Sequence, residues 1–221
     1  MPAANSVDFA REQMVRQQVR AWEVLDDRVL AVFEQLPRER FVPAEYAGMA
    51  FADAQIPLPD GECMLEPKLT GRILQALTIE PGERVLEVGT GSGFLSACMA
   101  HLGATVRSVE RHATLVEAAR QSLARCDVRE VEVVHADIWQ TMPAEGLYDV
   151  IVLTGSLPQY QAAFETALRP AGRLFSVVGE GPVMAAQLHR RLTTNDCSVT
   201  TLFETSLPAL FGAAQRERFQ F

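Results

Sequence analysis

The sequence predicts an α/β protein in which a mostly parallel sheet of the seven-stranded type is flanked by helices, with a helical extension at the N-terminus. Three observations support this prediction. Apolar segments of strand length alternate with segments of helical periodicity between residues 70 and 178, which is typical of a parallel sheet. The first apolar segment ends in a loop of alternating glycines. The region before it carries apolar residues at helical spacing.

The N-terminal 67 residues are expected to form a helical and loop subdomain that packs over the sheet. Residues 15–22 show a helical stripe, and Asp26 or Asp27 is expected to cap a second helix that ends at Pro37. Residues 41–67 contain too many prolines for a long element, yet they carry apolar side chains, so we expect an ordered loop. A helix over 70–77 then leads into the first strand.

Glycines alternate in the segment GTGSG at 89–93, directly after the strand predicted over 85–88. They permit unusual backbone conformations and let a ligand approach the main-chain amides. A dinucleotide-binding loop would have its third glycine at position 94, which is Phe94. With Glu87 near the strand end, the spacing resembles the first motif of S-adenosylmethionine-dependent methyltransferases with a Rossmann-like fold.

A second acidic residue ends the next predicted strand, 105–109. Glu110 follows Gly89 by 21 positions, and a carboxylate at about this offset can accept hydrogen bonds from both hydroxyls of a ribose. Taken alone, Glu110 could be a solvated loop residue. Its spacing from the glycine loop favours cofactor binding.

The helix and strand pattern continues after this point. Thr114 with Glu117 predicts a capping box, and residues 131–134 predict a third strand. Asp137 and Ile138 follow that strand, where the adenine of a cofactor would lie in this fold. Asp137 could accept a hydrogen bond from the exocyclic amine, or it could be a simple turn residue.

The fourth predicted strand, 148–153, is almost continuously apolar and should be buried on both faces. Ligands of open parallel sheets lie beyond the carboxyl ends of the strands, so residues 154–156 are expected to face the methionine end of the cofactor and the substrate. The remaining predicted elements are a helix over 158–168, a strand over 173–178 and an antiparallel edge pair, about 184–192 and 198–207, around a turn at 194–196.

Composition excludes several functions. The net charge of -8 opposes nucleic-acid binding, and we interpret the basic segment 189–191 as a solvated strand end. No apolar run approaches the roughly 18 residues of a membrane helix. The chain shows no signal peptide, which together with Cys98 as a core residue suggests a reducing cytoplasm. The four cysteines are dispersed, without histidines at zinc-ligand spacing, so no metal site is expected.

Several segments together resemble the protein-L-isoaspartate O-methyltransferase family. They are LPRERFVP at 36–43, ERVLEVGTGSGF at 83–94, SVERH at 108–112, YDVIVLTGS at 148–156 and LRPAGRLFSVVGE at 168–180. The resemblance implies a protein-repair methyltransferase that uses S-adenosyl-L-methionine, with residues 68–221 as the cofactor-binding, Rossmann-like domain. The expected cofactor-binding residues are Glu87, Gly89, Thr90, Gly91, Ser92, Gly93, Glu110, Arg111, Asp137, Ile138 and Thr154.

The substrate loop departs from that family. The family reads GQTISQP where this chain reads GECMLEP at 61–67, so the serine that lies near the transferring methyl is Leu65 here. Glu62 and Glu66 add negative charge, which opposes the binding of a carboxylate. We therefore expect weak activity on isoaspartyl peptides, and a protein or small-molecule carboxylate as acceptor. The predicted substrate-loop residues are Cys63, Met64, Leu65 and Glu66.

Methyl transfer to a carboxylate depends on alignment and exclusion of water more than on proton transfer, so the sequence names no general base and no catalytic residue. A non-catalytic cofactor-binding or interaction protein is the first alternative. A nicotinamide-dependent oxidoreductase is disfavoured by Phe94. The sequence makes no prediction of oligomeric state.

Overall fold

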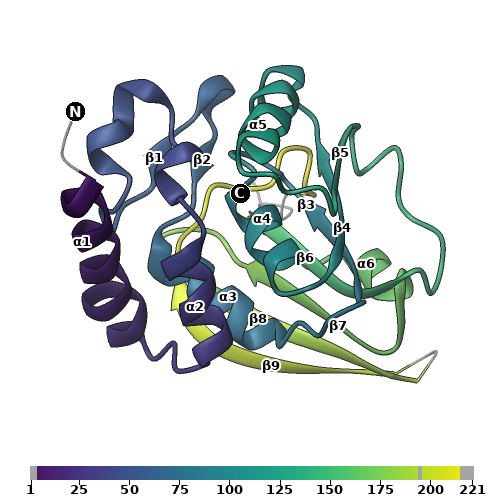
Figure 1. The fold of residues 1–221 in the computed structure, drawn as a ribbon. Coiled ribbons are helices and arrows are strands. Elements are labelled where there is room, and N and C mark those ends of the chain that lie inside the picture. Colours follow the sequence, from purple (N-terminus) through teal and green to yellow (C-terminus); the bar gives the residue numbers. More distant parts are fainter. Residues whose placement is uncertain (1–3, 194–195, 215–221) are drawn as a thin grey trace, which may run out of the picture.

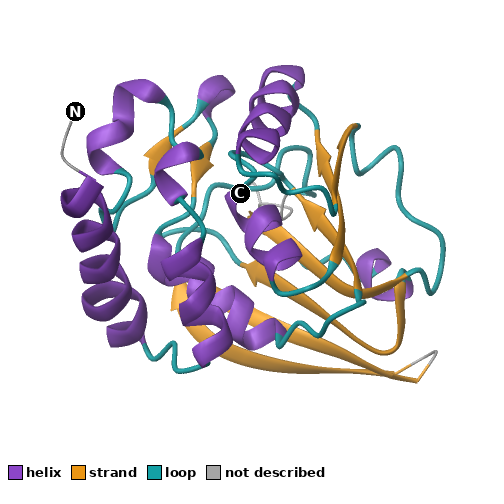
Figure 2. Cartoon of the chain, viewed as in Figure 1, coloured by secondary structure: helices purple, strands orange, loops and turns teal. Residues whose placement is uncertain are grey.

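The computed structural model describes residues 4–193 and 196–214, and it has the predicted α/β architecture (Figures 1 and 2). Seven strands form one sheet in the order β5-β4-β3-β6-β7-β8-β9. The five strands from β5 to β7 are parallel, and β8 and β9 are added antiparallel at the edge. The strands are β3 (Arg84–Val88), β4 (Thr105–Glu110), β5 (Val131–His135), β6 (Tyr148–Leu157), β7 (Leu168–Val178), β8 (Met184–Thr193) and β9 (Asp196–Thr205).

The N-terminal helices lie together beside the sheet, in purple and blue in Figure 1. The helix α1 (Ala4–Met14) continues through a π-helical and a 3-10 turn to Trp22, and α2 spans Asp27–Gln35. Asp26 caps α2, because its side chain accepts a hydrogen bond from the Arg28 amide at 2.8 Å. The segment predicted as an ordered loop holds 3-10 turns and a small hairpin of β1 (Ile56–Pro57) and β2 (Cys63–Met64), and it leads to α3 (Pro67–Leu77).

Two apolar clusters cover the two faces of the sheet. Along β6, Val150 and Val152 belong to the larger cluster, with side chains of α3, α4 (Phe94–His101) and α5 (Ala113–Arg125). Ile151 and Leu153 belong to the second cluster, with the one-turn helix α6 (Ala163–Thr166). This alternation explains why β6 reads as a continuous apolar run. Among the described residues, no helix combines the length and apolarity that crossing a membrane requires.

Two predicted helix features are wrong. The helix expected over 158–168 is only the four-residue α6. Tyr160 packs flat on His189 and donates a hydrogen bond to Glu165. These tertiary contacts hold the residues before α6 out of helical geometry. The capping box at Thr114 does not form. The helix α5 begins at Ala113 with His112 as its N-cap residue, two positions before Thr114, and the Thr114 hydroxyl instead donates to Asp60 at 2.6 Å.

The edge strands also correct one prediction. The basic segment 189–191 is not a solvated strand end, because His189 is 2% exposed and Arg191 is 4% exposed. Both side chains face the α6 side of the sheet, where His189 lies 3.1 Å from Glu165 and Arg191 lies 2.8 Å from Glu145. The edge pair itself forms as predicted. Residues 194 and 195 of the expected turn lie outside the described residues.

Arg173 joins the middle of β7 to the end of α3. Its buried guanidinium donates to the carbonyls of Leu77 and Thr78 and forms a two-pronged ion pair with Glu83 at 2.7 Å. Burial opposes ionisation of Glu83, but the hydrogen bonds from Arg173 and the Glu80 amide outweigh it and hold its pKa below the ordinary value. The stabilisation is therefore present at neutral pH and is lost as the pH falls through that lowered pKa.

Replacing Arg173 with methionine should lower the free energy of unfolding by about 2–4 kcal/mol, because helix carbonyls lose their donor and Glu83 loses its partner. Urea denaturation measures the change. The matched control is Arg169→Met, since Arg169 pairs with Asp149 while 41% exposed, and such pairs contribute about 0–1 kcal/mol. Equal losses in the two variants would contradict the assigned role of Arg173.

Candidate functional site

Parallel pairing brings the ends of β3 and β4 and the residue Thr154 of β6 to one edge of the sheet. Val88 of β3 is in register with Val109 of β4 and with Leu153 of β6. The next residues therefore meet: the Gly89 amide donates to the Val109 carbonyl at 2.9 Å, and the Thr154 hydroxyl lies 2.8 Å from the Gly89 carbonyl. Glycine is required at position 89, where φ is +92° and an added Cβ would lie 2.2 Å from the Thr154 hydroxyl oxygen.

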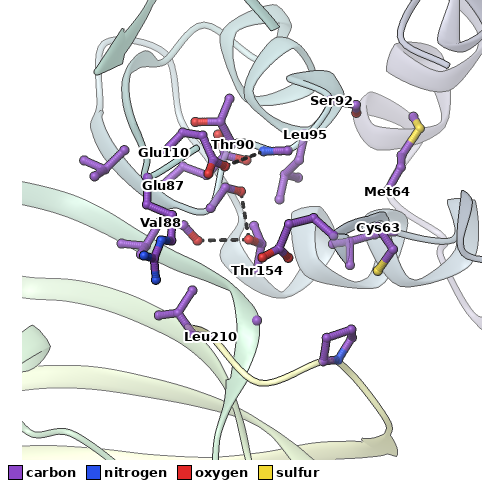
Figure 3. A pocket seen from close by; sticks show the side chains of 18 of the residues that line it. Cys63, Met64, Glu87, Val88, Thr90, Ser92, Leu95, Glu110, Thr154 and Leu210 are labelled. Atoms are coloured by element: carbon purple, nitrogen blue, oxygen red, sulfur yellow. Dashed lines mark hydrogen bonds between the residues drawn. The ribbon is translucent and has the colours of Figure 1, made fainter. Parts of the chain in front are cut away.

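A pocket opens at this edge, between the strand ends and the hairpin β1–β2. Figure 3 shows Glu87, Thr90 and Glu110 on one side, with Cys63 and Met64 opposite. The structure brings together thirteen of the residues predicted for the site: Cys63, Met64, Leu65, Glu87, Gly89, Thr90, Gly91, Ser92, Glu110, Arg111, Asp137, Ile138 and Thr154 all line the pocket.

Two predicted residues do not line the pocket. Gly93 precedes α4 with φ +82°, and an added Cβ there would lie 3.2 Å from Ala119, so it permits close packing of α4 against α5. Glu66 precedes α3, and its carbonyl accepts hydrogen bonds from the amide and hydroxyl of Thr70. Ser156, which was expected to face the cofactor, is buried instead and donates to the Leu207 carbonyl at 3.0 Å. It turns away because β6 continues to Leu157.

Glu110 ties the glycine loop to the end of β4. Its carboxylate accepts hydrogen bonds from the amides of Gly91 at 3.1 Å and His112 at 2.9 Å. The residue is only 4% exposed. Each carboxylate oxygen has more than one lone pair, so Glu110 can accept from a ligand while it keeps these bonds. Asp137 is similarly engaged, because it accepts from the Trp139 amide at 3.0 Å and closes a turn at the pocket wall.

Glu87 is fully buried beneath the glycine loop. One carboxyl oxygen accepts hydrogen bonds from the hydroxyls of Ser96 and Ser108, the latter at 2.6 Å, and Ser108 lies 2.6 Å from the Thr90 hydroxyl. The other oxygen, Oε1, has no hydrogen-bond partner among the residues that the structure describes. Burial raises the pKa of Glu87 from its usual 4.5 to about 7, although the two serines act in the opposite direction.

The loop after β2 is held by Arg38, a residue that sequence reasoning did not assign to the site. Its guanidinium donates to the carbonyls of Leu65 at 2.7 Å and Ala50 at 3.0 Å, and it lies 4.8 Å from the Phe94 ring centroid. Arg38 is completely buried, and burial lowers its pKa to about 10. The family-like segment 36–43 contains Arg38 and Arg40 on either side of Glu39, and nothing in the local sequence distinguishes the buried arginine from the other.

A further wall of the pocket comes from the chain after β9, which sequence reasoning also missed. Residues 208–211 line the pocket. The Ser156 amide donates to the Pro208 carbonyl and the Leu210 amide donates to the Ser156 carbonyl, both at 2.8 Å. The Arg111 guanidinium lies 3.3 Å from the centroid of the Phe211 ring. The sequence of this segment shows neither helical nor strand periodicity. Its position depends on main-chain hydrogen bonds with β6, which the sequence does not reveal.

The raised pKa of Glu87 predicts a pH-dependent stability. Between pH 4.5 and about 7, the folded protein binds more protons than the unfolded chain, so this contribution to stability falls as the pH rises. We expect Glu87→Gln to remove that slope. Relative to the variant, the parent should lose up to about 1.4 kcal/mol per pH unit across this interval. Urea denaturation at several pH values measures the difference in unfolding free energy between parent and variant. A difference that is constant with pH would contradict the raised pKa of Glu87.

Comparisons with known proteins agree with this geometry. The family model of protein-L-isoaspartate(D-aspartate) O-methyltransferase matches residues 10–207. A protein-L-isoaspartate O-methyltransferase of Methanoculleus marisnigri is 40% identical over 169 residues, covering 76% of this chain and 77% of the relative. One from Cronobacter sakazakii is 34% identical over 181 residues, covering 82% and 87%.

Solved structures have the same fold. A Plasmodium falciparum protein-L-isoaspartate O-methyltransferase in complex with S-adenosyl-L-homocysteine superimposes with a TM-score of 0.77 at 20% identity, covering 92% of this chain and 97% of that one. Another structure of that name gives 0.75 at 23% identity, covering 93% and 67%. The match of the family model over most of the sequence, together with these relatives, shows that the chain belongs to the protein-L-isoaspartate(D-aspartate) O-methyltransferase family.

Proposed function

We propose that this protein is an S-adenosyl-L-methionine-dependent O-methyltransferase that transfers a methyl group to a carboxylate. The observation that carries the proposal is the meeting of the glycine loop, Glu110 and Thr154 at one pocket in a chain of this family. The test is incubation with methyl-labelled cofactor and an isoaspartyl peptide, with a cell lysate as an alternative source of acceptors. Label in a base-labile ester supports the proposal, and no transfer to either source would contradict it.

Each part of the pocket has a proposed role in holding the cofactor. Glu110 accepts hydrogen bonds from the ribose hydroxyls, since a carboxylate at the end of the second strand suits this contact. Asp137 and Ile138 hold the adenine. The main chain of the glycine loop approaches the cofactor closely because it carries no side chains at 89 and 91, and Thr154 lies toward the methionine end. Ser92 and Arg111 complete the cofactor wall.

We further propose that two parts of the chain have different roles in the pocket. Residues 68–221 form the cofactor-binding domain, and residues 1–67 supply the substrate side. In support, the loop residues Cys63, Met64 and Leu65 line the pocket opposite the strand ends, and Arg38 holds the Leu65 carbonyl. Burial of Arg38 makes this contact costly to break, since an unpaired buried charge is strongly unfavourable.

When bound, S-adenosyl-L-methionine supplies an electrophilic methyl group on its sulfonium. The protein residues then act by orientation and exclusion of water. Met64 and Leu65, 4% and 8% exposed, form an apolar cover over the pocket. An ionised carboxylate is already a nucleophile, so no residue needs to remove a proton. The acceptor is a protein or small-molecule carboxylate.

The same apolar cover restricts the acceptor. Leu65 offers no side-chain hydrogen bond, and the Glu62 carboxylate also lines the pocket, 3.5 Å from His112. We propose that an isoaspartyl peptide is a weak acceptor and that a related carboxylate is preferred. A non-catalytic cofactor-binding protein is the alternative function, favoured by the altered loop alone.

All four cysteines are free, which supports a place in the reducing cytoplasm.

Glu110→Ala should weaken cofactor binding about 10- to 150-fold, because charge-assisted hydrogen bonds to the ribose are worth roughly 1.5–3 kcal/mol. Isothermal titration calorimetry with S-adenosylhomocysteine measures the loss. Glu117→Ala is the matched control, as a glutamate on the exposed face of α5 outside the pocket, and it should bind as the parent does. An affinity of Glu110→Ala within about twofold of the parent would show that Glu110 does not hold the ribose, because the lost bond is worth far more.

Leu65→Ser should raise methylation of an isoaspartyl peptide only modestly, by about 2- to 13-fold, since one added hydrogen bond contributes about 0.5–1.5 kcal/mol. The measurement compares kcat/KM of parent, variant and an established family member under one assay. Cofactor affinity serves as the control, because Leu65 is assigned to the substrate side. If the unmodified protein turns over the peptide as fast as the established enzyme, the restricted acceptor range is wrong.

A further inference from the structure

Three potential metal ligands lie together on the sheet face that α6 covers, away from the pocket. They are Glu165 of α6, His189 of β8 and Cys197 of β9. A carboxylate oxygen, an imidazole nitrogen and the thiol sulfur all lie within 4.8 Å of one another. None of these residues lines the methyl-transfer pocket, so the cluster is a separate feature of the molecule.

Strand register explains why the two strand residues meet. Arg191 pairs with Cys197 and His189 pairs with Val199 in the antiparallel ladder of β8 and β9. Side chains two positions apart project from the same face of a strand, so His189 and Cys197 are diagonal neighbours on one face. The cluster is shielded: His189 is 2% exposed, and the other two residues are partly buried. Glu165 reaches this face from α6.

Neighbouring side chains fix the orientation of the candidate ligands. The Tyr160 hydroxyl donates to Glu165 Oε1 at 2.6 Å, and the Tyr160 ring lies flat on the imidazole, with centroids 4.3 Å apart and planes at 6°. The other ring nitrogen, His189 Nε2, lies 3.2 Å from the Ser176 hydroxyl. Metal-binding histidines typically have such a partner on the second nitrogen, which fixes ring orientation.

We propose that Glu165, His189 and Cys197 form a zinc-binding site with a fourth position open to water. Zn²⁺ takes sulfur, nitrogen and oxygen ligands in tetrahedral geometry, and three protein ligands with one water is an established coordination pattern. One thiolate and one carboxylate balance the charge of the ion, so the buried site carries no net charge, which avoids the cost of an isolated buried ion.

The binding step exchanges protons and changes no oxidation state. Cys197 releases its thiol proton to solvent and binds as the thiolate. His189 Nδ1 lies 3.1 Å from Glu165 Oε1 and donates its proton to that carboxylate before zinc binds. On binding, the imidazole loses the Nδ1 proton to solvent and takes up a proton from solvent at Nε2, so Nδ1 binds the metal and Nε2 donates to Ser176. The zinc ion then joins α6 to the hairpin of β8 and β9. Ligand spacing along the chain did not predict this site, because the three residues come from separate elements.

Titration of the full-length, chelator-treated protein with Zn²⁺ by calorimetry tests the proposal, with Co²⁺ titration in parallel. We expect one zinc ion per chain and a near-ultraviolet thiolate-to-cobalt charge-transfer band. Cys197→Ser should abolish the band and weaken zinc binding at least roughly 100-fold, since the loss of a side chain that only hydrogen-bonds to a metal ligand already costs about 10- to 100-fold. Ser176→Ala should weaken it by roughly 10-fold.

Cys126→Ser is the matched control, because Cys126 is also a partly buried free thiol but lies outside the cluster. Its zinc affinity and cobalt band should equal those of the parent. Circular dichroism verifies folding, and Glu165→Gln replaces Cys197→Ser if that variant does not fold, with the same expected loss of zinc affinity. The proposal is overturned if the parent binds no zinc stoichiometrically, if the band survives Cys197→Ser, or if the band is lost in Cys126→Ser.

Discussion

Parallel pairing of β3 with β4 on one side and β6 on the other is the constraint on which the site depends. The register of Val88 with Val109 and Leu153 fixes how far each of the three strands reaches toward the pocket. It follows that Gly89, Glu110 and Thr154, each one residue further along, converge at one edge. A shift of one residue in either pairing would turn these side chains to the opposite face and separate the glycine loop from its acidic partner.

Buried polar groups then fix the geometry of that edge. Glu87 and Glu110 each bind groups from two elements, and their partners are serine hydroxyls or main-chain amides in place of bulk water. On the other side, Arg38 holds the loop after β2 through the Leu65 carbonyl. Such groups are costly to leave unpaired, so they favour a single arrangement of the pocket. The methyl-transfer function proposed for the protein needs this rigidity, because positioning supplies most of the catalytic effect.

The sequence was informative where function depends on local spacing. The glycine loop, Glu110 and the seven strands were predicted because each follows from residues close together in the chain. Arg38, the wall formed by residues 208–211 and the cluster around His189 were not predicted, because each depends on contacts between distant elements. The failed helix over 158–168 has the same origin. Tyr160 stacks on an imidazole about 30 residues further along, and this tertiary contact overrides the local preference.

A crystal structure of the protein with S-adenosylhomocysteine would test whether this pocket holds the cofactor through Glu110. We expect the ribose hydroxyls within hydrogen-bonding distance of Glu110, the adenine against Ile138, and the sulfur facing the Met64 and Leu65 cover. Cofactor bound outside this pocket, or a ribose turned away from Glu110, would contradict this expectation.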